Sequence, residues 1–224
     1  TEDTTPIVTT TVAADTVDWT LTVASATVTE GGTSTYTVTL DGDTLQDGET
    51  ASVSIALNLV GSTEIADLDP SFMTAISDAV SAYNAGLTLS AMDPGSFGLV
   101  GATLTYYGDG TTTNPALDID VATFDDNIVE PAEDFNLLLF PPVGGTVLPQ
   151  VGIATTSPVV TTIVDNDVAT VSIVGTINAE EDPVSFGTDG QFQVILSNPV
   201  QGVVTVSLFP PRFRSSGESH EILK

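Results

Sequence analysis

Threonine alternates with apolar residues along most of this chain, and no other feature of the sequence restricts the fold so strongly. In residues 34–40, Tyr36, Val38 and Leu40 fall on one face and threonines fall on the other. A repeat of two residues is that of a β-strand with one buried and one exposed face. Six further segments share the alternation: 19–23, 53–59, 102–106, 117–124, 135–140 and 158–164. Seven strands separated by Gly, Asp, Asn and Pro turns predict an all-β fold, an antiparallel seven-stranded β-sandwich.

One segment departs from the strand pattern. Phe72, Ile76, Val80 and Tyr83 recur at the spacing of one helix face, an Asp-Pro pair precedes them and a glycine follows them. Asp before Pro favours a helix start, and glycine favours a helix end. We therefore predict a short amphipathic helix over residues 70–84, inserted into the sandwich. We expect it to cover a sheet edge or one end of the core. The alternative is that its apolar face docks a neighbouring molecule.

The sequence also contains an internal repeat. Residues 6–15, PIVTTTVAAD, align with residues 158–167, PVVTTIVDND. Two more matches follow the first: 19–21 with 171–173, and 36–40 with 192–196. Self-similarity at a long, regular spacing indicates a tandem array of similar units.

The repeat predicts how the chain divides into domains. Residues 1–15 would be the last strand of a preceding repeat, and residues 16–167 one complete domain. Residues 168–211 would be the first strands of an incomplete following repeat. The last segment, 212–224, holds the 3 basic residues and lacks strand periodicity. We expect it to be a tail, either disordered or foreign to the array.

Charge excludes several classes of partner. The chain holds 30 acidic and 3 basic side chains, a net charge of −27, and no Lys or Arg precedes residue 212. Nucleic acids and anionic membranes are bound through Lys and Arg, so neither is an expected partner. The sequence has no run of about 20 apolar residues, so we predict no membrane insertion. Because 41% of the residues are hydrophobic, the charge does not predict disorder.

Carboxylates concentrate in three loops: one around Glu30, one over residues 125–134, and one over residues 165–167. Close carboxylates repel each other by about 1–4 kcal/mol per pair, depending on the local dielectric. With no basic side chain to pair with, a multivalent cation is the natural partner. Calcium accepts many oxygen ligands in tolerant geometry, whereas magnesium demands a stricter octahedron, so we predict Ca²⁺. The alternative is that these loops are solvated and that Asp-Asn-Asp is a plain turn.

Three motifs occur in order: Glu-Gly-Gly at residues 30–32, Asp-Asp-x-x-x-Glu-x-x-Glu-x-Phe at 125–135, and Ile-x-Asp-x-Asp at 163–167. Together they resemble the Calx-β family over residues 17–167, and the resemblance returns weakly in 168–210. Members of that family are seven-stranded immunoglobulin-like sandwiches whose acidic loops, at one end, bind a small cluster of calcium ions. The resemblance implies an antiparallel immunoglobulin-like sandwich in tandem repeat.

Carried over by position, the resemblance implies a set of metal ligands. Ile128 would contribute its backbone carbonyl. Asp67 is preferred over Asp69 for the loop after the third strand, because Asp69 is equally well explained as a helix N-cap. The inserted helix that follows this loop departs from the family pattern. The remaining carboxylate ligands would be Glu30, Asp125, Asp126, Glu130, Glu133, Asp165 and Asp167.

Enzymatic chemistry is not predicted. Residues 1–211 contain neither His nor Lys to activate a nucleophile. Paired carboxylates can cleave glycosides, but the metal motif already accounts for these. We predict a calcium-binding structural or adhesive repeat of a large secreted bacterial cell-surface or extracellular-matrix protein, with Ca²⁺ rigidifying the junction between repeats. Its partners would be calcium ions, neighbouring repeats or copies of the same protein, and a surface receptor or polysaccharide.

Two alternatives belong to other classes. A self-assembling fibre or surface-coat subunit would join its copies by β-strand complementation, using an unpaired strand edge. A cytosolic calcium-sensor module of a transporter would share the fold but fits the repeat and the charge less well.

Overall fold

The computed structural model describes residues 16–61, 67–68, 71–142, 151–155, 157–177 and 190–209. The predictions for residues 1–15, for Asp69 and for the segment 212–224 lie outside these ranges. The strands are β1 (Val17–Val23), β2 (Thr27–Thr29), β3 (Thr33–Gly42), β4 (Thr50–Val60), β5 (Phe97–Val100), β6 (Thr103–Tyr107), β7 (Ala116–Ala122), β8 (Glu133–Phe140), β9 (Val151–Ile153), β10 (Val159–Val164), β11 (Val171–Ile177) and β12 (Gln191–Leu196). The helix α1 spans Phe72–Gly86.

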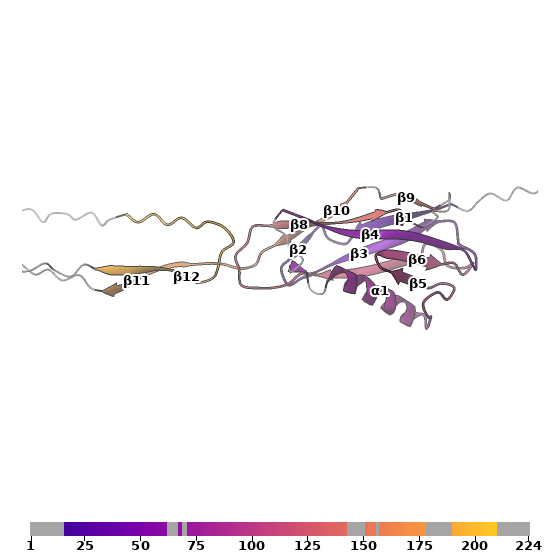
Figure 1. Cartoon of the computed structure of the whole chain (residues 1–224), viewed down its shortest axis with the longest axis horizontal. Coiled ribbons are helices and arrows are strands. Elements are labelled where there is room, and N and C mark those ends of the chain that lie inside the picture. The colour runs from indigo at the N-terminus through magenta and orange to yellow at the C-terminus, as the bar shows by residue number, and fades with distance from the viewer. Residues whose placement is uncertain are drawn as a thin grey trace, which may run out of the picture.

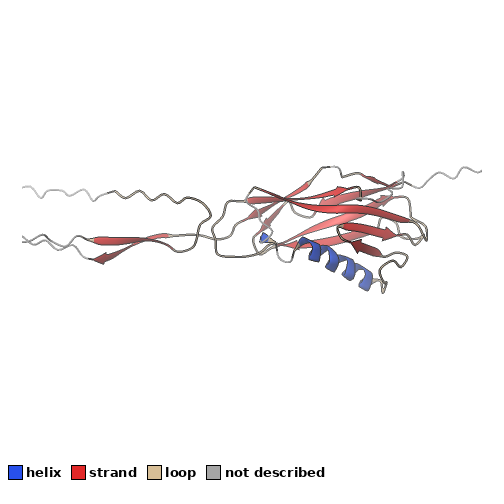
Figure 2. Ribbon diagram, viewed as in Figure 1, coloured by secondary structure: helices blue, strands red, loops and turns tan. Residues whose placement is uncertain are grey.

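Two sheets form the main body, which is almost entirely β-structure apart from α1 (Figure 1, Figure 2). One sheet has four strands in the order β7-β3-β1-β9, and the other has six in the order β2-β10-β8-β4-β6-β5. Each of the seven segments that alternate in the sequence overlaps a strand. In β1, β3, β6, β7 and β8, buried positions alternate with more exposed ones, and the buried positions hold mainly apolar residues. The all-β class is therefore confirmed.

The sheets are mixed rather than entirely antiparallel. β1 pairs in parallel with β9, and β2 pairs in parallel with β10. The chain passes from one sheet to the other between β1 and β2, where the Ser25 hydroxyl donates a hydrogen bond to the Thr27 carbonyl (2.7 Å). β9 and β10 are divided between the same two sheets. The first and last segments of the domain consequently run side by side.

Aromatic side chains fill the space between the two sheets. Trp19 and Tyr36 come from the four-stranded sheet, and Tyr106 and Phe135 come from the six-stranded sheet; all four are at most 1% exposed. The Tyr36 and Phe135 rings lie 6.2 Å apart in a tilted arrangement, and the Tyr36 hydroxyl is hydrogen-bonded to Thr161. Aromatic rings from both sheets thus pack together in a single hydrophobic core.

Helix α1 covers an open side of the sandwich, as the sequence indicates, but begins and ends two residues later than predicted. It packs against β7 and β5, which are edge strands of the two sheets. Phe72, Ile76 and Val80 are buried in this contact. Near its C-terminus, the Asn84 side chain accepts a hydrogen bond from Phe97 N (3.0 Å) and donates one to Phe97 O (2.7 Å). The helix therefore satisfies part of the unpaired edge of β5.

Threonine hydroxyls provide hydrogen-bond partners for aspartates on the outer face of the four-stranded sheet. Thr35 donates to Asp120 (2.6 Å) and Thr37 donates to Asp118 (2.7 Å). Each of these pairs joins neighbouring positions on β3 and β7. Cross-strand pairs of this kind stabilise a sheet, and here they replace the ion pairs that the described residues, which contain no Lys or Arg, cannot form.

β11 and β12 form a two-stranded antiparallel hairpin beyond the end of the sandwich (Figure 1). Its register is Val171↔Leu196, Ile173↔Val194 and Gly175↔Phe192. β1 and β3 pair as Trp19↔Leu40, Leu21↔Val38 and Val23↔Tyr36. The sequence repeat aligns Trp19 and Leu21 with Val171 and Ile173, and Tyr36, Val38 and Leu40 with Phe192, Val194 and Leu196. The hairpin residues are exposed, however, whereas their counterparts in β1 and β3 are mostly buried.

In the part of the chain that the structure describes, no helix has the length and apolarity needed to cross a membrane.

Replacing Asn84 with leucine tests the attachment of α1. The change leaves the buried N–H and C=O of Phe97 without hydrogen bonds, so we expect the free energy of unfolding to fall by about 2–4 kcal/mol. Urea denaturation measures the change. Ser77→Ala, on the exposed face of the same helix, is the control and should change stability by less than about 0.5 kcal/mol. Equal effects of the two substitutions would contradict this role for Asn84.

Candidate metal centre

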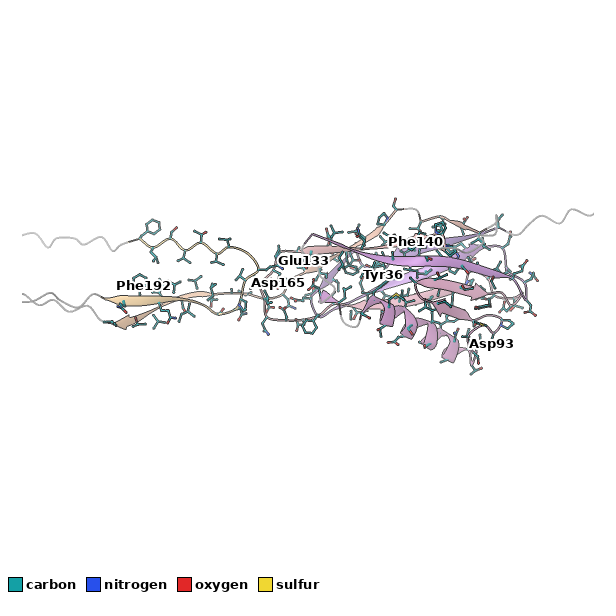
Figure 3. All side chains as sticks on the ribbon, in the orientation of Figure 1. Tyr36, Asp93, Glu133, Phe140, Asp165 and Phe192 are labelled. Atoms are coloured by element: carbon teal, nitrogen blue, oxygen red, sulfur yellow. The ribbon has the colours of Figure 1, made fainter. Side chains whose placement is uncertain are left out.

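The acidic residues converge because β2 and β10 run in parallel. Thr29 lies opposite Val164 in that pair, so the residues after both strands emerge at one edge. Glu30 N donates a hydrogen bond to Val164 O (3.0 Å), which fixes Glu30 beside the start of the 165–167 loop. Figure 3 shows Asp165 and Glu133 at this end of the sandwich, facing the hairpin, while Asp93 lies at the opposite end.

Gly31 lets the loop from β7 approach Glu30 closely. It has a φ of +72°, a conformation that glycine adopts without strain. A Cβ at this position would lie 2.9 Å from the Asp125 Cβ, so a side chain would collide with Asp125. Gly31 N also donates to Phe124 O (3.2 Å). The glycine of the Glu-Gly-Gly motif thus brings two acidic loops into contact.

Glu30, Asp165 and Asp167 form one close group, in which one carboxylate oxygen from each residue lies within 4.8 Å of the other two. All three side chains are partly buried. Glu30 Oε2 and Asp167 Oδ2 are buried oxygens that have no hydrogen-bond partner among the described residues. Buried carboxylate oxygens without a partner are costly, and a cation placed among them would remove this cost.

A small cavity of about 10 Å³ lies next to this group. That volume is close to the space occupied by a single water-sized sphere. Carboxylates from four separate parts of the chain reach its wall, together with Phe124, Pro131 and Ile163. The acidic lining residues are Glu30, Asp67, Glu130, Glu133 and Asp165. Five of the residues predicted as metal ligands therefore surround one space of ionic dimensions.

Asp125 and Asp126 lie at the border of this group. Asp126 N donates a long hydrogen bond to Glu30 Oε1 (3.4 Å). The Asp126 carboxylate itself accepts a hydrogen bond from Ile128 N (2.6 Å). The backbone of Ile128 is therefore anchored in the cluster through its N–H, while a role for its carbonyl stays a prediction.

Asn166 is a site residue that the sequence reasoning did not identify. Its Nδ2 donates both to Glu30 O and to Asp125 Oδ1, each at 3.1 Å. The amide separates two acidic loops and gives each of them a donor. The sequence feature that could have identified Asn166 is its position as the one neutral residue of Asp-Asn-Asp. An amide at this position supplies the N–H groups that a carboxylate lacks.

Crowding changes the protonation of the cluster. Burial, followed by the charges of Glu133, Asp67, Asp126 and Glu30, raises the pKa of Glu130 to about 7. Burial, then the charges of Asp126, Asp165 and Asp167, also raises the pKa of Glu30, although a hydrogen bond from the Asp126 backbone opposes the rise. The pKa of Asp167 is raised for similar reasons. The cluster therefore favours bound protons or another positive charge.

The structure brings the predicted ligands together at one end of the domain, and none of them lies elsewhere. Comparison with known proteins gives no match to a family model and none to a curated protein. The metal-binding role of these residues and the resemblance to the Calx-β family accordingly stay predictions.

The raised pKa of Glu130 predicts how stability depends on pH when metal is removed. A carboxyl whose folded-state pKa is about 7, against an ordinary 4.5, binds its proton more tightly in the folded protein. Its contribution to stability is fully present below its ordinary pKa and is lost as the pH rises through about 7. We expect the melting temperature in chelator to increase as the pH falls from about 8 to about 5.

Thermal melts in chelator at several pH values measure this dependence. Glu130→Gln is the matched control, because it removes the titrating group and should flatten the curve in the upper part of the range. A wild-type melting temperature that decreases as the pH falls from about 8 to about 5 would contradict the prediction.

Proposed function

We propose that this chain is a calcium-binding structural repeat and that the acidic end of its sandwich holds the ions. The observation that supports this most directly is the convergence of Glu30, Asp165 and Asp167, with two buried oxygens lacking hydrogen-bond partners among the described residues. No Lys or Arg side chain precedes residue 212. A bound cation is therefore the available source of positive charge within this part of the fold.

The donor set favours calcium over other metals. The group consists of carboxylates, with backbone carbonyls nearby and no cysteine in the chain. Zinc prefers nitrogen and sulfur ligands, and magnesium requires near-octahedral geometry and retains water. Calcium accepts many oxygens at flexible positions, which suits ligands delivered by several separate loops.

When bound, calcium would neutralise the repulsion among these carboxylates. Glu30, Asp67, Glu130 and Asp165 line one cavity yet belong to four different segments of the chain. An ion contacting them would tie those segments together and hold the loops in one arrangement. This is the action of a structural metal site, in which binding energy contributes to folding.

We further propose that residues 16–167 form a Calx-β-like immunoglobulin domain and that β11 and β12 begin a second one. The register of β11 with β12 from Val171 to Gly175 matches that of β1 with β3 from Trp19 to Val23, and this match supports a tandem arrangement. A cysteine-free, highly acidic chain of this kind suits a calcium-rich setting outside the cell. We therefore infer a structural or adhesive role in a secreted bacterial surface protein, with neighbouring repeats as partners.

Calcium should raise the melting temperature, because a ligand that binds only the folded state stabilises it. At a free concentration of about 100 times Kd the gain is about 2.7 kcal/mol, or about 5–10 °C for a domain of this size. Glu130→Gln and Asp167→Asn keep the side-chain shape but remove charge, and should lose most of the rise. Asp43→Asn, exposed and remote from the cluster, should keep it.

Differential scanning calorimetry with calcium, magnesium and chelator measures these shifts, and titration calorimetry measures binding directly. An unchanged melting temperature together with no heat of binding would refute the calcium proposal.

A self-assembling fibre is the second candidate function, and the exposed hairpin favours it. Ile173 is 56% exposed and Phe192 is 57% exposed, although their counterparts Leu21 and Tyr36 are buried. An unpaired apolar strand can accept a strand from another copy.

Under the primary proposal, the purified chain with calcium sediments as a monomer and forms no ordered filaments in electron micrographs. Filaments that Ile173→Asp abolishes would instead support strand exchange between copies, because a buried charge at that position would break the contact.

A further inference from the structure

The acidic loop between β7 and β8 makes a main-chain contact with the segment that follows the hairpin. Val129 N donates a hydrogen bond to Pro199 O (3.0 Å), and Gln201 N donates one to Val129 O (2.9 Å). These two bonds form a parallel β-bridge between Val129 and Val200. A loop of the sandwich is thereby paired with the chain beyond β12.

The residues on either side of Val129 are held by carboxylates of the acidic cluster. Ile128 N donates to Asp126 Oδ1 (2.6 Å), and Glu130 N donates to Asp165 Oδ2 (3.0 Å). Successive N–H groups in this stretch therefore point in opposite directions, as they do in an extended strand. Those of Ile128 and Glu130 bond to the cluster, while that of Val129 bonds to the following unit. Any displacement of Asp126 or Asp165 thus acts on Val129 through its two neighbours.

The receiving segment is also tied to the covalent connection between the sandwich and the hairpin. Asn198 Nδ2 donates to Val168 O (3.1 Å), and Ser197 N donates to Thr170 O (3.0 Å). Asp165 begins the same connection and accepts the bond from Glu130 N. The contacts consequently close a ring. It runs from Asp165 along the connection to Thr170, across to Ser197, and through Val129 and Glu130 back to Asp165.

We propose that the backbone of Val129 is the contact surface that positions the following unit, and that calcium bound by the flanking carboxylates holds it in place. This inference rests on the proposed calcium-binding function. A unit joined by the connection alone can rotate about it, whereas a second attachment at Val129 removes that freedom. Calcium would act by fixing Asp126 and Asp165, and through them the direction of the Val129 N–H and C=O groups.

Spin-label distance measurements on the whole chain test this proposal. The chain has no cysteine, so Thr22→Cys on β1 and Gln193→Cys on β12 give two unique label sites at exposed positions. Pulsed electron paramagnetic resonance reports the width of the distance distribution, with calcium or with chelator. Gln201→Pro removes the N–H that bonds to Val129 O, and Gln201→Ala keeps it as the matched control.

We expect calcium to narrow the distribution in the wild type and in Gln201→Ala, and this narrowing to be lost in Gln201→Pro. Calcium affinity by titration calorimetry should stay within about threefold of wild type in both variants, since neither alters a ligand. Narrowing that persists in Gln201→Pro would overturn the proposal. Calcium binding without narrowing in the wild type would overturn it and leave the proposed function standing, whereas no binding at all would overturn both.

Discussion

Mutual repulsion among carboxylates is the constraint on which this structure depends, because the described residues contain no lysine or arginine to offset it. On the sheet faces the acids are spaced along strands, and threonine hydroxyls suffice as partners, as in Thr35–Asp120 and Thr37–Asp118. At one end, the loops bring together more carboxylate oxygens than the nearby N–H and O–H groups can hydrogen-bond. Under the calcium proposal, the geometry of that end would consequently depend on the bound cation.

The parallel pairing of β2 with β10 determines which parts of the chain share this end. It brings the first loop of the domain against its last, so that Asn166 bonds to Glu30 across a separation of 136 residues. A cation shared by these loops would close most of the domain into a ring. Closing a long loop removes more conformational freedom from the unfolded chain than closing a short one. Under the calcium proposal, ion binding at the acidic end would therefore stabilise the entire sandwich.

Sequence periodicity predicted seven strands of the sandwich and the helix, because each has a continuous apolar face that needs burial. The seven strands are β1, β3, β4, β6, β7, β8 and β10. Periodicity did not predict β2, β5 or β9, which have three or four residues each and depend on the strands beside them. The parallel pairing was also missed, since alternation reveals a face but not a direction. For the site, charge and motif spacing indicated the carboxylates. Asn166 was missed because its contribution comes from bridging two loops that only the fold brings together.

The contact at Val129 is made by main-chain atoms, and that has a consequence for how such chains diverge. Val129 and Gln201 donate backbone N–H groups that every residue except proline possesses. Substitutions other than proline would keep these two hydrogen bonds, whereas an inserted or deleted residue would change which N–H meets which carbonyl. Selection would then preserve the length of the loop more strictly than its amino-acid sequence. Units of dissimilar sequence could be spliced at this position and still meet at the same angle.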